Sequence, residues 1–158
     1  MSKVTDNYHI YLKATELAAI AAAKLRGNGD GKAADKVATE AMRKVLQESN
    51  IHTRVVIGEG ERDDAPMLYI GEEMGDLSSD LKIDIAVDPL ECTNHCAKNL
   101  PDALAVLAAA PRGALLHAPD TYMDKLCGSR ELIGKLSLSN SVSENLKATS
   151  KALNKSMS

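Results

Sequence analysis

Four acidic residues stand beside glycine or proline at the ends of two β-branched stretches. Glu59 and Glu61 alternate with glycine after the first stretch, and Asp88 and Glu91 flank Pro89 after the second. Carboxylate oxygens are the ligands that Mg²⁺ and Mn²⁺ prefer. Two carboxylates about 4 Å apart repel by roughly 4 kcal/mol at an effective dielectric constant of about 20. If these side chains converge, a divalent metal ion is the simplest compensation.

A hydroxyl group follows the second acidic pair, because Thr93 stands five residues after Asp88. If a helix begins near Thr93, the N–H groups of residues 92–94 would point toward an anion such as phosphate. Thr93 would also fit a purely structural role as the cap of that helix. Acidic residues in turns are commonly just solvated, so spacing alone leaves the metal site and the solvated turn both open.

Cys92 and Cys96 are four residues apart with His95 between them, a pattern that zinc sites also use. No second pair of ligands is evident apart from the distant His117 and Cys127, so zinc is the weaker interpretation. Cys92 is also a poor candidate for a catalytic nucleophile, because the sequence places no base beside it.

Three helices are expected to carry or support these residues. Apolar residues recur at helical spacing over about 6–26 and 32–48, with a glycine-rich break between the two segments. Ser141 and Glu144 form a capping-box pattern that predicts a helix over about 144–153. The side chains expected to face inward are Ile10, Leu17, Ala18, Ala21 and Leu25 on the first helix and Val37, Ala41, Val45 and Leu46 on the second.

Short apolar runs predict the strands. Residues 54–57 and 83–87 are β-branched, and the second run is expected to end directly at the Asp-Pro pair. Residues 103–110 form a continuous apolar run, which is typical of a buried strand. Two further strands are expected, at 114–117 and 121–126.

Composition narrows the possible partners. The 158 residues are enough for one compact domain, and aromatic residues make up only 3%, with no Phe and no Trp. The net charge of −3 argues against a nucleic-acid partner, because a protein that binds polyanions in general would be basic. No apolar run is long enough to predict a membrane span, and three cysteines suit a reducing cytoplasm better than a disulfide framework.

Longer motifs surround the acidic residues. The segment 55–73, VVIGEGERDDAPMLYIGEE, closely resembles the signature of class II fructose-1,6-bisphosphatases. That family includes bacterial enzymes and the cyanobacterial type that also accepts sedoheptulose 1,7-bisphosphate. The other segments that resemble the family, in the family's order, are Gly29-Asp30 with 33–35, then 84–91, 104–108, 117–123 and 143–147.

The resemblance implies a fold and an activity. The fold would be α/β, of the layered α+β kind, and the N-terminal part of the lithium-sensitive sugar and inositol phosphatase fold. Residues 1–158 would form its N-terminal metal- and phosphate-binding domain. The implied activity is Mn²⁺- or Mg²⁺-dependent hydrolysis of the 1-phosphate of fructose 1,6-bisphosphate, and also of sedoheptulose 1,7-bisphosphate, in gluconeogenesis or the Calvin cycle. A cytoplasmic homo-oligomer is the implied state.

The resemblance also assigns roles to individual residues. The metal ligands it implies are Asp35, Glu59, Asp88 and Glu91. The substrate contacts it implies are Glu91, Cys92, Thr93 and Tyr122. The catalytic residues it implies are Thr93, which would orient the water or the leaving group, and Glu61, which would act as a base or orienting group.

Three positions depart from the family pattern. The family has glycine where this chain has Cys92, and glycine there would supply an unusual backbone angle or let phosphate approach the backbone. The family has lysine directly after the residue matching Asp30, whereas here Gly31 comes before Lys32. Asn99 also stands where glycine is usual.

The chain is shorter than the family pattern, and this leaves two functional hypotheses. Family members continue into a second α/β region, so we expect a C-terminally truncated version that exposes an apolar face of its sheet. One hypothesis is the phosphatase itself. The other is a truncated, catalytically impaired fragment that binds metal or partner subunits without turnover. Inositol-monophosphatase-like hydrolysis is a weaker enzymatic alternative, because the surrounding motifs resemble the bisphosphatases.

Overall fold

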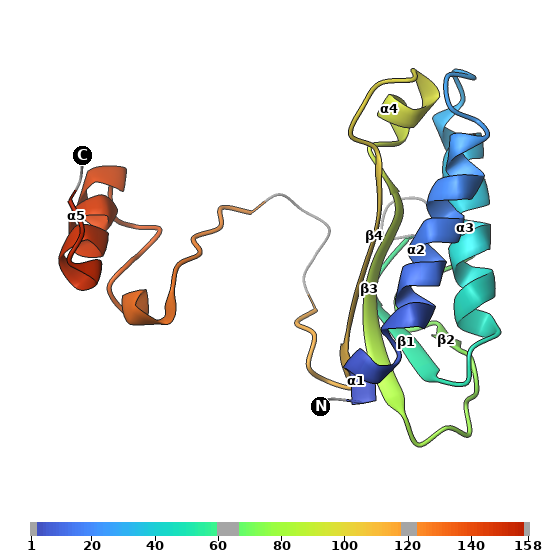
Figure 1. The fold of residues 1–158 in the computed structure, drawn as a ribbon, viewed down its shortest axis with the longest axis horizontal. Helices are drawn as coiled ribbons and strands as arrows, with labels where there is room; N and C mark the ends of the chain where they lie inside the picture. Colours follow the sequence, from blue (N-terminus) through green and yellow to red (C-terminus); the bar gives the residue numbers. More distant parts are fainter. Residues whose placement is uncertain (1–2, 60–66, 118–122, 157–158) are drawn as a thin grey trace. The chain divides into compact units, whose positions relative to one another are not determined.

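The computed structural model describes residues 3–59, 67–117 and 123–156. The chain divides into two compact units, Met1–Pro119 and Asp120–Ser158. Figure 1 shows the elements of both units. The first unit contains α1 (Lys3–Asp6), α2 (Tyr8–Ala23), α3 (Gly31–Gln47), β1 (His52–Ile57), β2 (Glu73–Met74), β3 (Lys82–Glu91), α4 (Thr93–Ala97) and β4 (Leu104–Pro111).

The first unit is built on a four-stranded mixed sheet with the order β2-β1-β3-β4. Strands β1 and β3 run parallel, and β2 and β4 are antiparallel to their neighbours. Arg54 lies beside Asp84, and Ile85 lies beside Ala109. The expectation of a layered α/β fold is therefore confirmed.

Helices α2 and α3 pack side by side against one face of this sheet (Figure 1). Their bounds lie close to those predicted from apolar periodicity. Small side chains let the two helices approach each other and the sheet closely. The buried alanines are Ala14, Ala18 and Ala22 on α2 and Ala34 and Ala38 on α3.

The predicted inward faces are partly right. Ile10 and Ala18 on α2 and Val45 and Leu46 on α3 are buried. Leu17 is exposed, so that prediction was wrong. The buried residues of α2 recur every four positions, from Ile10 to Ala22, and Leu17 is not one of these positions. The remaining predicted residues are half-buried: Ala21, Leu25, Val37 and Ala41.

Strand β3 is longer than predicted. It continues through Asp88 and Pro89 to Glu91 instead of ending at the Asp-Pro pair. Its pairing with β4 shifts register between Asp88 and Glu91, which marks a β-bulge. Proline is tolerated at such a bulge because the ladder is already interrupted there.

Strand β4 forms as predicted but is not buried. Its residues alternate between exposed and half-buried, and Leu104 and Val106 are exposed on the face of the sheet opposite α2 and α3. This agrees with the expected exposed apolar face. The strands predicted at 114–117 and 121–126 are wrong for the described residues 114–117 and 123–126, which form no strand; residues 121 and 122 lie outside the described part.

A buried carboxylate joins the strands of the sheet. Asp84 is only 1% exposed and accepts two hydrogen bonds from Arg54, at 3.0 and 2.9 Å. The backbone N–H of Gly113 donates to the same carboxylate at 2.6 Å, and Arg112 Nε lies 3.1 Å from it. Burial alone would raise the pKa of Asp84, but these hydrogen bonds and the two guanidinium charges hold it below its ordinary value.

The same arginine extends the network to the edge of the sheet. Arg112 donates to Glu73 at 3.1 Å and to the backbone oxygen of His52 at 3.4 Å. The Nε2 atom of His52 lies 3.2 Å from the same Glu73 carboxylate. Together with Asp84, these contacts link β2, β1, β3 and the turn after β4.

The second unit contains a short 3-10 helix, η1 (Arg130–Leu132), and the helix α5 (Val142–Leu153). The predicted capping box is confirmed, because Ser141 accepts from the N–H of Glu144 and Glu144 accepts from the N–H of Ser141. Asn145 holds the preceding loop through two hydrogen bonds with the backbone of Ser137. Across the described residues, no helix is both long and apolar enough to span a membrane.

Replacing Asp84 with asparagine tests the buried network. Asp84→Asn leaves two guanidinium groups without their shared anion, so we expect the free energy of unfolding at pH 7 to fall by about 3 kcal/mol. Chemical denaturation measures this loss. The control is Asp80→Asn, which changes an exposed aspartate and should shift the value by less than about 0.5 kcal/mol.

The same pair of variants gives a pH signature. Because the pKa of Asp84 is lowered in the folded chain, its stabilisation is present above the ordinary pKa of about 4 and is lost as the pH falls below it. The difference between wild type and Asp84→Asn should therefore shrink below about pH 4. A difference that stays constant with pH would contradict the role assigned to the carboxylate charge.

Candidate metal centre

A β-bulge brings two acidic side chains together at the end of β3. Side chains three residues apart on a regular strand point to opposite faces. Here Asp88 pairs with Val106 and Glu91 pairs with Leu104, so three steps on β3 match two steps on β4. The extra residue returns Glu91 to the side of Asp88, where its carboxyl group raises the pKa of Asp88.

Three carboxyl groups act on one another at this point. Partial burial, the hydrogen bond with Glu91 and the charges of Glu91 and Glu59 raise the pKa of Asp88 to about 7. The N–H of Leu90 opposes them by donating to Asp88 Oδ1 at 3.1 Å. The charges of Glu59 and Glu91 thus disfavour ionisation of Asp88, and a divalent cation would relieve that repulsion. That these residues serve as metal ligands stays a prediction.

Glycine fixes the position of Glu59. Glu59 follows β1 after Gly58, and its N–H donates to the backbone oxygen of Leu68 at 2.9 Å. A Cβ atom on Gly58 would lie 2.2 Å from that same oxygen and 2.5 Å from Val55 Cγ1. Only glycine lets the chain cross here and turn Glu59 toward the end of β3.

The backbone turns sharply between the carboxylates and α4. Cys92 caps α4 with φ 64° and ψ 54°, which is the left-handed region that favours glycine. Its carbonyl accepts from the N–H of His95 at 2.8 Å. Thr93 is the first residue of the helix, so a helix does begin at the predicted place. The interpretation of Thr93 as its cap was wrong, because Cys92 holds that position.

The other end of α4 is also left-handed. Asn99 has φ 55°, its N–H donates to Cys96, and the N–H of Leu100 donates to His95 at 2.8 Å. This is the Schellman arrangement, which usually ends in glycine and accepts asparagine at small cost. Both positions where the family pattern has glycine therefore need a positive φ, and Cys92 is the less suitable occupant of the two.

Helix α3 begins beside Thr93. Asp30 caps this helix by accepting from the N–H of Ala33 at 3.0 Å. A Cβ atom on Gly31 would lie 3.4 Å from the backbone oxygen of Thr93, so the two chain segments touch there. Asp35 is half-buried in the same helix, four residues after Gly31. This places Asp35 at the Thr93 end of the sheet.

The contacts of Cys92, His95 and Cys96 argue against a zinc site. The Cys96 thiol is buried and donates to the backbone oxygen of Ala22, and His95 Nδ1 lies 2.8 Å from the Pro101 oxygen. Partial desolvation, the hydrogen bond to Glu91 and nearby carboxylate charges raise the pKa of the Cys92 thiol. A thiol that stays protonated is a poor nucleophile and a poor metal ligand.

One neighbour of the site was missed from the sequence. The charge of Asp102 contributes to the raised pKa of Cys92, so Asp102 lies near the start of α4. Asp102 has a backbone φ of 71° and lies in the loop before β4. A Pro-Asp pair ahead of an apolar run was the only signal in the sequence, and it is equally typical of an ordinary turn.

Two predicted residues, Glu61 and Tyr122, lie outside the described residues. Within the described ranges, no group of three or more His, Cys, Asp or Glu side chains is arranged to hold a metal ion unaided. Carboxylates at the end of β3 still fit Mg²⁺ or Mn²⁺ chemically, since Mg²⁺ is usually held by one or two carboxylates together with water and substrate phosphate.

Comparison with known proteins gives one consistent result. A family described as bacterial fructose-1,6-bisphosphatase, glpX-encoded, matches residues 7–158. A protein of Parasynechococcus marenigrum (strain WH8102), named D-fructose 1,6-bisphosphatase class 2/sedoheptulose 1,7-bisphosphatase, is 51% identical over 142 residues, which cover 90% of this chain and 42% of that protein. A protein of the same name from Thermosynechococcus vestitus (strain NIES-2133 / IAM M-273 / BP-1) is 45% identical over 157 residues, covering 92% and 45%. The chain thus spans less than half the length of these relatives.

Cys92→Gly tests the backbone strain before α4. We expect this change to raise the free energy of unfolding by about 1 kcal/mol, the left-handed penalty reduced by the greater freedom of unfolded glycine. Chemical denaturation at pH 7 measures it. Cys92→Ala removes the thiol but keeps the Cβ atom, so it should give no such gain. Equal gains from both variants would show that the thiol, rather than the backbone angle, is the cause.

Asp88→Asn tests the carboxylate repulsion in metal-free protein. A raised pKa means that the folded chain loses stability as the pH rises from about 4 to about 7 and is level above that. Asparagine removes this loss, so the variant should be more stable than wild type at pH 8 by on the order of 1 kcal/mol, since solvent screens a half-exposed group. The gain should vanish near pH 4. A variant less stable than wild type at pH 8 in EDTA would contradict the proposed repulsion.

Proposed function

This chain belongs to the bacterial glpX-type fructose-1,6-bisphosphatase family, and we propose that it takes part in metal-dependent hydrolysis of the 1-phosphate of fructose 1,6-bisphosphate. Sedoheptulose 1,7-bisphosphate is the second proposed substrate, as the names of the relatives suggest. The observation that carries the proposal is the raised pKa of Asp88, which burial and the neighbouring Glu91 and Glu59 carboxylates cause at the end of β3, just before the first turn of α4.

The chemistry of the carboxylates supports Mn²⁺ or Mg²⁺ as the cofactor. Asp88 and Glu91 would hold the cation from β3, and Glu59 would approach it from the end of β1. Asp35 joins the proposal as a further ligand at the same end of the sheet. A cation held by so few protein ligands would keep positions for water and phosphate oxygens, as metal-dependent phosphatases require.

The residues around the carboxylates suggest separate roles in the proposed hydrolysis. When bound, the cation would polarise the phosphoryl oxygens and lower the pKa of a nearby water. Glu91 and the backbone at Cys92 and Thr93 would contact the phosphate, and the Thr93 hydroxyl would orient the water or the leaving oxygen. We further propose Glu61 as a base or orienting group and Tyr122 as a sugar or distal phosphate contact.

Three broader assignments belong to the same proposal. The layered α/β arrangement is consistent with the N-terminal part of the lithium-sensitive sugar and inositol phosphatase fold. The free thiols of all three cysteines suit a cytoplasmic protein. A homo-oligomer is the proposed working state, because apolar side chains such as Leu104 remain exposed.

Phosphate release from fructose 1,6-bisphosphate tests the proposal. We expect the chain to release phosphate with Mn²⁺ and to stop when EDTA is added. Asp88→Asn should lower the rate and the Mn²⁺ affinity by at least about 100-fold, because it removes a charged ligand. Asp80→Asn is the matched control and should change neither. Sedoheptulose 1,7-bisphosphate, assayed in parallel, gives the sugar preference.

Cys92→Gly decides between the two functional hypotheses. Faster turnover in this variant than in wild type would show that the cysteine impairs an active site that is otherwise complete. If wild type and Cys92→Gly both bind Mn²⁺ but neither releases phosphate, the enzymatic proposal fails and metal binding without turnover is left. Loss of Mn²⁺ binding in Asp80→Asn as well as Asp88→Asn would overturn the assignment of the site.

A further inference from the structure

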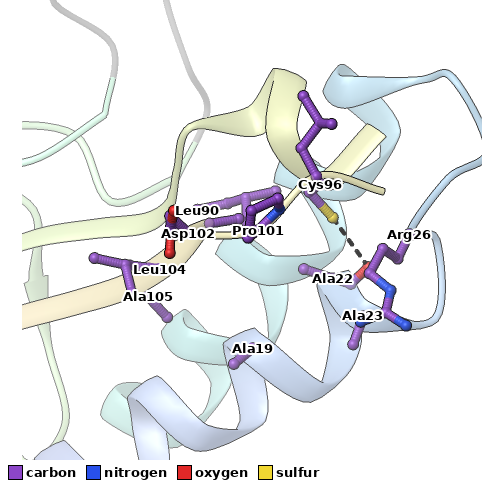
Figure 2. Close-up of a pocket in the computed structure, with 12 residues that line it drawn as sticks. Ala19, Ala22, Ala23, Arg26, Leu90, Cys96, Pro101, Asp102, Leu104 and Ala105 are labelled. Atoms are coloured by element: carbon purple, nitrogen blue, oxygen red, sulfur yellow. Dashed lines mark hydrogen bonds between the residues drawn. The ribbon is translucent and has the colours of Figure 1, made fainter. Parts of the chain in front are cut away.

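The end of β3, which carries Asp88 and Glu91, is held in place by packing. Leu90 lies between these two residues on the strand and is only 5% exposed. It lines a cavity of about 230 Å³ together with small side chains of α2 and with Cys96 of α4 (Figure 2). The Cys96 thiol donates to the backbone oxygen of Ala22 at 3.5 Å, which connects α4 to α2. Asp88 and Glu91 thus take their positions from a well-packed strand.

Glu59 lies beyond the end of its own strand, because β1 stops at Ile57. Two backbone contacts connect Glu59 to the segment 68–72. Its N–H donates to the Leu68 oxygen at 2.9 Å, and it forms an isolated β-bridge with Tyr69. The position of Glu59 therefore depends on the conformation of Leu68.

Leu68 has a backbone conformation that its side chain disfavours. Its φ of 55° lies in the left-handed region, where a Cβ atom crowds the following carbonyl oxygen. Leu68 is also fully buried, so its N–H needs a hydrogen-bond partner within the protein. Such a strained residue persists only where its surroundings hold it firmly.

The carboxylate of Glu72 provides that partner. Glu72 is 5% exposed, and its Oε2 atom accepts a hydrogen bond from the N–H of Leu68. The backbone of Glu72 is itself fixed to β1, because the N–H of Val55 donates to its oxygen at 3.0 Å. The Glu72 side chain thus joins the end of the segment 68–72 to its start and holds the Leu68 amide in the left-handed orientation.

Arg43 neutralises this buried carboxylate. Its Nε atom donates to Glu72 Oε1 at 2.7 Å, which leaves Oε2 for Leu68. A buried carboxylate without such a partner would be strongly destabilising. Arg43 lies on α3, the helix that also carries the proposed ligand Asp35. The Arg43–Glu72 pair therefore connects the helix of Asp35 to the segment that contacts Glu59.

We propose that Glu72 is a positioning residue for the candidate metal centre, because it holds Leu68 in the left-handed conformation whose carbonyl oxygen fixes Glu59. This role rests on the proposed function, in which Glu59 binds the cation. Glu72 acts through Leu68 and Glu59 and is not itself a ligand. Loss of a residue that orients a metal ligand typically lowers metal affinity by roughly 10- to 100-fold.

Two uncharged double variants isolate the hydrogen bond to Leu68. Arg43→Met with Glu72→Gln removes both charges but keeps a side-chain oxygen for the Leu68 N–H, whereas Arg43→Met with Glu72→Leu removes that acceptor as well. Neither variant leaves an unpaired buried charge, so both should fold, and circular dichroism checks this. Calorimetric titration should give the Gln variant a Mn²⁺ affinity within about 3-fold of wild type and the Leu variant one that is roughly 10- to 100-fold lower.

Asp84→Asn is the control for a general loss of stability. It also removes a buried carboxylate that arginines neutralise, but the bonds of Asp84 go to Arg54, Arg112 and Gly113 and not to the segment 68–72. Its Mn²⁺ affinity should stay within about 3-fold of wild type. Weakening as large as that of the Leu variant would overturn the positioning role, and so would equal Mn²⁺ affinities in the two double variants.

Amide hydrogen exchange tests the positioning of Glu59 without metal. In EDTA, the exchange rate of the Glu59 amide relative to that of Ile85, in the buried middle of β3, should be at least about 10-fold higher in the Leu variant than in the Gln variant. Equal ratios would overturn the proposal. If wild type binds no Mn²⁺, the proposed function fails, and the exchange comparison still decides whether Glu72 holds Leu68 and Glu59 in place.

Discussion

A carboxylate that is 1% exposed cannot stay ionised without compensation, and Asp84 receives that compensation from two arginines. Arg54 comes from β1 and Arg112 from the turn after β4, so the charge in the middle of β3 ties the strands on both sides to it. Four residues further along the same strand and on the same face, Asp88 has glutamates for neighbours instead. The pKa of Asp84 is lowered and that of Asp88 is raised to about 7. On the same strand, Asp84 is a structural carboxylate that arginines neutralise, whereas Asp88 has no cationic neighbour among the causes of its pKa shift. The position of Asp88 therefore marks the candidate metal centre.

The backbone before α4 sets the positions of the side chains around Asp88. The bulge in β3 turns Glu91 toward Asp88, and the left-handed Cys92 then starts α4 at once, with Thr93 beside the carboxylates. Glycine would occupy that conformation without strain. Cys92 carries this strain at the position between the predicted metal ligand Glu91 and the predicted phosphate contact Thr93. A fold stabilised at Asp84 is able to tolerate it.

Local patterns in the sequence were enough to predict the helices. Apolar spacing and the capping box at Ser141 depend only on neighbouring residues, so the ends of α2, α3 and α5 were predicted to within three residues. Features set by distant partners were not predictable. The pairing of Asp84 with Arg54 spans thirty residues, and the exposure of β4 depends on what packs beside it. Pro89 was wrongly taken as the end of a strand because a bulge is recognisable only once the partner strand is known. Residue type suggested a metal site only if the acidic side chains converge, and the ligand set implied by the family resemblance stays a prediction. The resemblance also singled out Cys92 and Asn99, both of which have a positive φ.

The central claim is that the carboxylates at the end of β3 hold a divalent cation, and proton release on Mn²⁺ binding tests it most directly. With a pKa of about 7, Asp88 is partly protonated at neutral pH in metal-free protein, and a metal ligand must give up its proton. Calorimetric titration in buffers of different ionisation enthalpy should therefore show protons released on Mn²⁺ binding at pH 7, fewer at pH 8.5, and none in Asp88→Asn. Mn²⁺ binding that releases no proton at pH 7, or that is unchanged in Asp88→Asn, would contradict the account.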